Sequence, residues 1–147
     1  LRSGTLNVPA IVGFGAAADL MTPGGAEPQR IAGQRDRLEQ EIQRRVAGVR
    51  VNGGNAPRLP GISNLTFAGI EGEALLLELR ELAVSTGSAC ASASLEPSHV
   101  LLAMGRPQEE ARSSIRFSLG RFTRDDEIER AIDEVVRGVD RLRAHAS

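Results

Sequence analysis

Two long segments of the chain carry the repeating pattern of an amphipathic helix, and a helix of this kind must bury its apolar stripe against a second layer. The first pattern covers residues 28–47, and the second follows Thr123, which we expect to cap it, and runs to about residue 145. Charged residues fill the other positions. The apolar stripes consist of Ile31, Leu38, Ile42 and Val46 in the first pattern and of Ile128, Ile132, Val135, Val139 and Leu142 in the second.

The layer against which these helices pack is predicted by segments with a period of two. Short runs that favour β structure predict strands near 49–51 and 62–68, and 114–122 alternates as a third strand. Residues 71–84 have a helical pattern, and two short helices are expected between residues 97 and 114. The order of these elements predicts an α+β fold, a small and mostly antiparallel sheet covered by helices.

A further helix is expected near the start of the chain, from about residue 7 to 21, with Thr5 or Asn7 as its cap. The Gly- and Pro-rich stretch that follows is typical of a break between structural units. We therefore expect residues 1–25 to form a terminal helix segment and residues 26–147 to form the main domain.

Charge and composition exclude several classes of function. The 147 residues have a formal net charge of -1, so no basic face for nucleic acid is indicated, and no apolar run has the length of a membrane span. A single cysteine and two distant histidines form neither an internal disulfide nor a zinc set, which fits the reducing cytoplasm. All 18 basic residues are arginine, so chemistry that needs a lysine amine cannot occur within this chain.

The one cysteine, Cys90, lies in a run of serine, alanine and glycine. An unpaired cysteine is more often a small buried hydrophobic residue than a nucleophile. Here, however, the side chains between Ser85 and Ser94 are too small to form a core around the sulfur, which favours an exposed and movable thiol. A reactive thiol would also need a lowered pKa, and the sequence leaves the cause of such a shift open.

Arg116, on the polar side of the last predicted strand, has two interpretations. A surface salt bridge is the ordinary one, whereas a bidentate contact with a substrate carboxylate suits the planar guanidinium. Arg121 is a weaker candidate for the same role. The short motif at 3–5 could present hydroxyls to a phosphate or simply cap a helix. His99 is interpreted as a surface residue. The turn-forming residues 52–55 are assigned no function.

Three segments together, "RSGTLNVPAIVGFG", "STGSACASASLEPSHVL" and "SSIRFSLGRFT", resemble in order and separation the C-terminal part of a cysteine desulfurase of the NifS/IscS group. These are fold type I pyridoxal phosphate enzymes of the class V aminotransferase family. The resemblance covers essentially the whole chain, and the cysteine segment is similar to the long-loop form of the family.

The resemblance implies an enzyme that takes sulfur from L-cysteine, releases alanine and passes the sulfur to an iron–sulfur scaffold or another acceptor protein. The bound cofactor withdraws electrons from the substrate. Cys90 matches the residue that carries the sulfur as a persulfide, through which it could contact an iron–sulfur cluster, and Arg116 matches the residue that binds the substrate carboxylate. Thr5 matches a residue that contacts the cofactor phosphate of the neighbouring subunit, which implies a homodimer.

The lysine that holds pyridoxal 5'-phosphate in this family would lie upstream of "RSGT", as would the histidine and aspartate that contact its ring. We therefore expect a fragment, in which 1–25 is the last helix of a missing large cofactor-binding domain and 26–147 is the small domain. Alone it should not turn over cysteine. The alternatives are a non-catalytic sulfur carrier or scaffold-binding module, or a product of proteolysis or of a split reading frame. We expect the first helix to keep its position less well than any other part of the fold, because its apolar face would lack a packing partner. Exposed apolar surface should favour dimer contacts.

Overall fold

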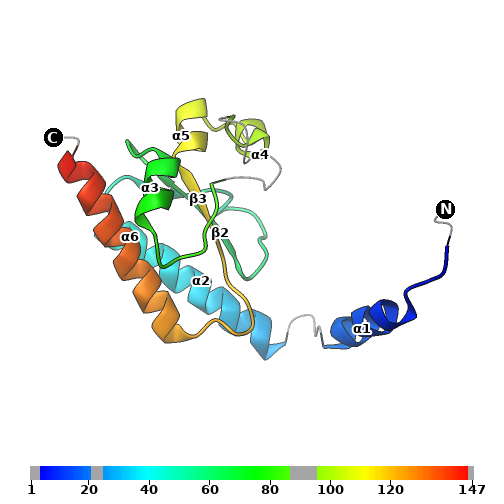
Figure 1. Cartoon of the computed structure of the whole chain (residues 1–147). Coiled ribbons are helices and arrows are strands. Elements are labelled where there is room, and N and C mark those ends of the chain that lie inside the picture. Colours follow the sequence, from blue (N-terminus) through cyan, green and yellow to red (C-terminus); the bar gives the residue numbers. More distant parts are fainter. Residues whose placement is uncertain (1–3, 21–24, 87–95, 146–147) are drawn as a thin grey trace.

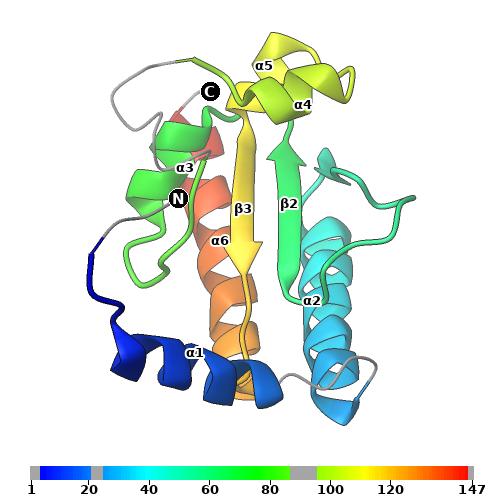
Figure 2. The same cartoon turned by 90° about the vertical axis from the view of Figure 1, so that its right-hand side faces the viewer.

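The computed structural model describes residues 4–20, 25–86 and 96–145 and has the predicted α+β architecture. Three strands form an antiparallel sheet in the order β1-β2-β3. Helices α2 and α6 cover one face of this sheet, and α4 and α5 lie at its end (Figures 1 and 2). In chain order the elements are α1 (Val8–Asp19), α2 (Ala26–Arg45), β1 (Val49–Val51), β2 (Ile62–Phe67), α3 (Gly72–Glu78), α4 (His99–Ala103), α5 (Gln108–Arg112), β3 (Ser114–Ser118) and α6 (Asp125–His145).

The hydrophobic core lies between the sheet and the two long helices. Alternate residues of β2 and β3 point toward the helices, and the apolar stripes of α2 and α6 meet them as the sequence predicts, although Leu142 is only half-buried. Since the core has no Trp or Tyr, its stability is spread over many aliphatic contacts. Its fully buried side chains include Leu38, Ile42, Leu65, Phe67, Ile115, Ile132, Val135 and Val139.

The opposite face of the sheet is polar. Thr66 and Ser114 are paired across β2 and β3, are both buried, and share a hydrogen bond of 2.8 Å between their hydroxyl oxygens. The hydroxyl of Ser114 also donates to the carbonyl oxygen of Glu110 in α5 at 2.7 Å. Helix α5 thus covers one end of the polar face, while Arg116, two residues further along β3, is exposed.

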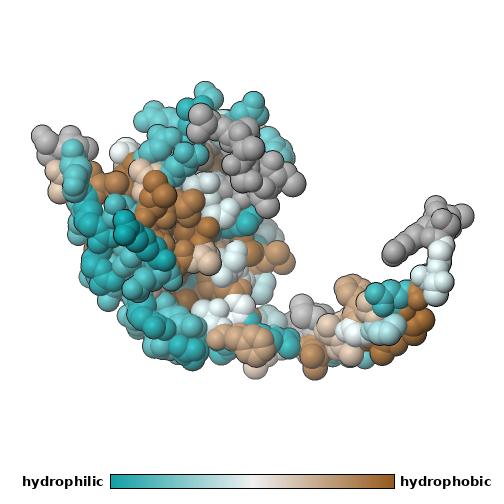
Figure 3. Space-filling model, in the orientation of Figure 1, coloured by the Kyte–Doolittle hydropathy of each residue, from teal (hydrophilic) through white to brown (hydrophobic). Residues whose placement is uncertain are grey.

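Helix α1 stands away from the rest of the domain, and Figure 1 shows its N-terminal end pointing away from the sheet. None of its residues is buried, and large apolar side chains such as Ile11 and Phe14 are more than half exposed. Figure 3 shows brown surface along this helix. Asn7, one of the two predicted caps, forms the cap by accepting a hydrogen bond of 3.2 Å from the backbone N–H of Ala10.

Three local predictions were wrong in detail. Strand β3 ends at Ser118 instead of reaching residue 122, because the chain then turns, with the backbone N–H of Thr123 donating to the carbonyl oxygen of Gly120 at 3.1 Å. Helix α3 ends at Glu78 instead of reaching residue 84, because Leu79 leaves the helical conformation (φ -86°, ψ 57°) while it stays buried. Thr123 does not cap α6, since its hydroxyl accepts a hydrogen bond of 2.9 Å from the backbone N–H of Gly120. The start of α6 is instead stabilised by Glu127, whose carboxylate accepts from the backbone N–H of Arg124 at 2.9 Å.

Candidate functional site

The described end of the cysteine segment runs beside strand β3 at Arg116. The backbone N–H of Arg116 donates to the carbonyl oxygen of Ser85 at 2.6 Å, and the N–H of Ser85 donates to the carbonyl oxygen of Arg116 at 3.2 Å. Ser85 thereby extends the sheet by one residue beyond β3. Cys90 itself lies in residues 87–95, outside the described part of the chain, but this bridge fixes the point from which its segment departs.

The guanidinium of Arg116 is exposed, and the structure gives it neither an ion pair nor a hydrogen bond within the described residues. Arg80 and Arg112 are alike in this, but they lie in a turn and in α5 rather than on the sheet. Arg121, the weaker candidate, has the surface salt bridge of its ordinary interpretation, at 3.0 Å from Glu27. Arg116 is therefore a cation whose donors remain available to an anion.

A hydrogen-bonded cluster lies next to Arg116 and involves a residue for which the sequence predicted only a turn. Asn52 is 5% exposed, and its side-chain amide donates to Asn64 Oδ1 at 2.7 Å, to Thr66 Oγ1 at 2.8 Å and more weakly to Ser114 Oγ at 3.3 Å. Asn64 is in turn the direct cross-strand neighbour of Arg116. Asn64 was missed by the sequence reasoning. The sequence did offer one indication, because asparagine is rare in strands and Asn64 lies within the strand run "ISNLTF".

Thr5 lies before α1 and is exposed. Because Asn7 caps α1, the capping interpretation does not account for Thr5, and the structure gives no partner for its hydroxyl within the described residues. The chain does not bring Thr5 and Arg116 together, since α1 projects from the domain (Figure 1). His99 begins α4 and is exposed, as its interpretation as a surface residue requires.

The residues of this chain do not by themselves fit pyridoxal phosphate. A Schiff base needs a primary amine on a side chain, and the sequence has no lysine. Within the described ranges no three His, Cys, Asp or Glu residues are grouped so that they could hold a metal ion.

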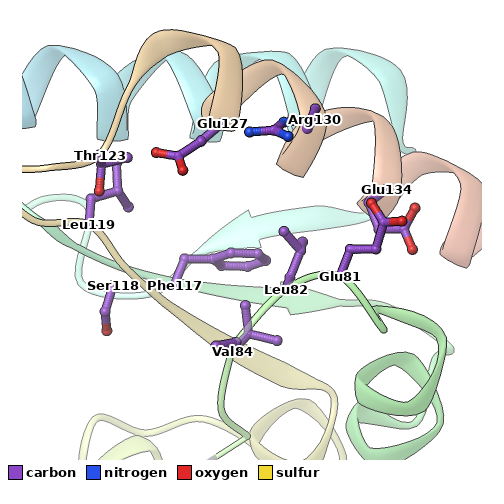
Figure 4. A pocket seen from close by; sticks show the side chains of 11 residues that line it. Glu81, Leu82, Val84, Phe117, Ser118, Leu119, Thr123, Glu127, Arg130 and Glu134 are labelled. Carbon is purple, nitrogen blue, oxygen red and sulfur yellow. The ribbon is translucent and has the colours of Figure 1, made fainter.

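A pocket of about 380 Å³ opens beside the end of β3, between the segment that follows α3 and the first half of α6 (Figure 4). Its apolar lining includes Leu82, Val84 and Phe117, and its rim carries charged residues of α6. Arg116 does not line it. The pocket is therefore distinct from the surface around Arg116.

Shifted pKa values occur at ion pairs outside this surface. The side-chain hydrogen bond from Arg124 holds the pKa of Asp126 below its ordinary value, and the hydrogen bond from Arg44 does the same to the pKa of Glu41. A hydrogen bond to Glu39 raises the pKa of Arg58. These pairs lie on the long helices and loops, so they bear on stability rather than on the site.

No helix in the described part of the chain is long and apolar enough to span a membrane.

Comparison with known proteins gives a consistent match. The model of the aminotransferase class-V family matches residues 1–131. A cysteine desulfurase IscS from Anaeromyxobacter sp. (strain Fw109-5) is 52% identical over 143 residues, which are 97% of this chain and 35% of that protein. The mitochondrial cysteine desulfurase of Arabidopsis thaliana is 49% identical over 144 residues, or 97% of this chain and 32% of that protein.

The fold is also found in solved structures. A NifS-like protein from Rickettsia africae ESF-5 superposes with a TM-score of 0.80 at 33% sequence identity, over 95% of this chain and 36% of that one. A second NifS-like protein gives a TM-score of 0.77 at 25% identity, again over 95% of this chain and 36% of that one. This chain thus spans about a third of the length of the relatives that it matches.

Proposed function

The chain belongs to the class-V aminotransferase family, and on that premise we propose that it is the C-terminal, sulfur-accepting part of a cysteine desulfurase. In this proposal L-cysteine is the substrate, alanine is released, and Cys90 carries the sulfur to an acceptor protein such as an iron–sulfur scaffold. Arg116 binds the carboxylate of the substrate. The relatives named as cysteine desulfurases support the activity, and the geometry around Arg116 supports the assignment of roles.

The observation that carries the proposal is the backbone pairing of Arg116 with Ser85. Four residues lie between Ser85 and Cys90 along the chain, and an extended chain spans at most about 3.5 Å per residue. A thiol on that tether can reach a substrate whose carboxylate is held at Arg116. The guanidinium has no competing carboxylate among the described residues, so it can bind one from the substrate.

The sulfur transfer needs a thiolate at Cys90. Its sulfur attacks the sulfur of L-cysteine, an S–S bond forms as the C–S bond of the substrate breaks, and the electron pair of the C–S bond stays with carbon. A proton at that carbon then completes alanine. Arg116 contributes orientation, because it fixes the substrate carboxylate while the thiol approaches from its tether.

We propose further that residues 1–25 belong with the large cofactor-binding domain of a longer protein and that residues 26–147 form its small domain. The absence of buried residues in α1 supports this division. Thr5, exposed ahead of α1, would contact the phosphate of pyridoxal phosphate in a homodimer. Because this chain has no lysine for the Schiff base, we derive no step through the cofactor. The cytoplasmic location stays a prediction.

The alternative is a sulfur carrier or scaffold-binding module without catalysis, and it is favoured by the absence of lysine from the sequence. The two functions are separated by assaying alanine release from L-cysteine, first with this chain alone and then with the chain joined to the N-terminal remainder of the Anaeromyxobacter relative. We expect alanine only from the joined protein. Replacing Arg116 with alanine should raise KM for L-cysteine at least tenfold, since a hydrogen-bonded charge pair is lost.

Arg50→Ala is the matched control, because Arg50 lies on β1 and is already paired with Glu110. The KM of this variant should stay within about twofold of the wild type. Equal KM values for Arg116→Ala and wild type would refute the role of Arg116. Alanine release by the chain alone would refute the proposal that catalysis needs the N-terminal remainder.

A further inference from the structure

Four polar residues form one row across the whole sheet. Asn52, just after β1, donates its backbone N–H to the carbonyl oxygen of Asn64 at 2.8 Å, Asn64 is paired with Arg116, and Arg116 is bridged to Ser85. Residues paired directly in antiparallel strands place their side chains on the same face. The row therefore runs from a buried asparagine through Arg116 to the residue that precedes the cysteine segment.

The pairing of Asn64 with Arg116 is of the close kind. Both backbone polar groups of Arg116 are used by Ser85, and the carbonyl of Asn64 is used by Asn52, so these two residues form a pair without mutual backbone hydrogen bonds. In such pairs the Cα atoms are about 4.5 Å apart and the side chains are closest. The amide of Asn64 consequently lies beside the stem of the Arg116 side chain.

Asn52 determines which end of the Asn64 amide is free. Its Nδ2 donates to Asn64 Oδ1 at 2.7 Å, and Asn52 is itself held by Thr66 Oγ1 at 2.8 Å. The oxygen of Asn64 is thus occupied, and its NH2 group has no acceptor within the described residues. Asn64 is half-buried and Arg116 is exposed, so two sets of donors without a partner among the described residues lie next to each other on one face.

Two adjacent donor groups without an acceptor form a site for a carboxylate, which has acceptor oxygens only. We propose that Asn64 completes the substrate-carboxylate site, with its NH2 group donating to one oxygen while Arg116 binds the carboxylate by charge. Asn52 is the positioning residue that holds the Asn64 amide in the donating orientation. The inference rests on the proposed role of Arg116. It adds to that arginine a neutral hydrogen-bond donor, the NH2 group of Asn64, for one oxygen of the carboxylate.

The variant that tests this is Asn64→Asp. An aspartate oxygen can still accept the hydrogen bond from Asn52, so the fold is kept, whereas the donor is lost and a negative charge is placed beside Arg116. Since the added charge can by itself weaken binding at Arg116, the uncharged Asn64→Ser variant is measured beside it. It keeps a small hydroxyl acceptor for Asn52 and removes the NH2 group, so it should also weaken binding, whereas a purely structural Asn64 would tolerate it.

The measurement is an NMR titration of the chain with L-alanine, which has the carboxylate of the substrate and no thiol, and with L-alaninamide, which lacks that carboxylate. We expect the side-chain NH2 signals of Asn64 and the Nε–H signal of Arg116 to shift together with L-alanine and not with the amide. Asn64→Asp should weaken binding at least tenfold, since a hydrogen bond to a charged group is replaced by repulsion. The control Arg50→Ala should leave the affinity within about twofold.

The outcomes separate this inference from the proposed function. A saturable shift at Arg116 without one at Asn64, or an Asn64→Asp variant of unchanged affinity, would overturn the role of Asn64 and leave that of Arg116 intact. No shift at either residue would overturn both. A shift of equal size with the amide would show that the site does not recognise a carboxylate.

Discussion

Gly72 allows the start of α3 to approach the end of α5, and this approach fixes the upstream end of the cysteine segment. A Cβ at this position would lie closer than 3.0 Å to the carbonyl oxygen of Arg112, a separation that real Cβ atoms essentially never show. It would also stand 3.4 Å from Cγ2 of Thr86, the last described residue before that segment. The obstructing atom is backbone, so it cannot rotate away.

Gly72→Ala should therefore destabilise the fold. Forcing an extra carbon into packed structure costs about 3 kcal/mol at the upper end of the usual range, and the higher helix propensity of alanine offsets about 1 kcal/mol of this. The expected loss in the free energy of unfolding is about 2 kcal/mol. For a chain of this length that lowers Tm by about 6 °C.

The matched control is Gly33→Ala. Gly33 is an exposed residue of α2, and a Cβ there would meet nothing within 4 Å, so only the gain in helix propensity remains. This variant should be about 1 kcal/mol more stable than the wild type. Urea unfolding followed by circular dichroism measures both. If Gly72→Ala were as stable as Gly33→Ala, the close approach of α3 to α5 would be refuted.

Three further predictions concern the ion pairs and α1. Arg58→Ala leaves the carboxylate of Glu39, 7% exposed, without its partner and should cost about 2 kcal/mol in urea unfolding, whereas Arg124→Ala, at an exposed ion pair, should lower the midpoint only slightly. The hydrogen bond from Arg124 lowers the folded-state pKa of Asp126. The stabilisation that this ion pair gives to the fold is therefore present above about pH 4, and it is lost as the pH falls through the lowered pKa of Asp126. Any difference in Tm between wild type and Arg124→Ala should thus shrink below that pH. A chain that lacks residues 1–25 should unfold at the same urea midpoint, since α1 buries none of its residues, and a lower midpoint would contradict that packing.

Sequence periodicity predicts those parts of the fold in which the spacing of apolar side chains is compatible with only one kind of secondary structure. The stripes of α2 and α6 and the alternation of β3 follow from the need to bury apolar residues, and they were predicted correctly. The end of α3 was not predictable in this way, because Leu79 and Leu82 are apolar whether the helix continues or turns. The packing of Leu79 and Leu82 against the core determines where the helix ends.

The candidate site shows a similar division. Arg116 was identified because its strand has clear polar and apolar faces, and its backbone partner Ser85 lies where the cysteine segment begins. Asn52 and Asn64 were not identified, because a turn residue and a strand residue twelve positions apart are brought together only by the pairing of β1 with β2. The asparagine within the strand run marks Asn64 as unusual, but the register that pairs it with Asn52 leaves no local signal in the sequence.

The measurement that tests the central claim most directly is the intact mass of this chain after it has been joined to the N-terminal remainder of the Anaeromyxobacter relative, loaded with pyridoxal phosphate and supplied with L-cysteine. We predict that one sulfur atom is added, that peptide mapping places it on Cys90, and that Cys90→Ser acquires none. Alanine release with the added sulfur on another residue, or with none on this chain, would contradict the account.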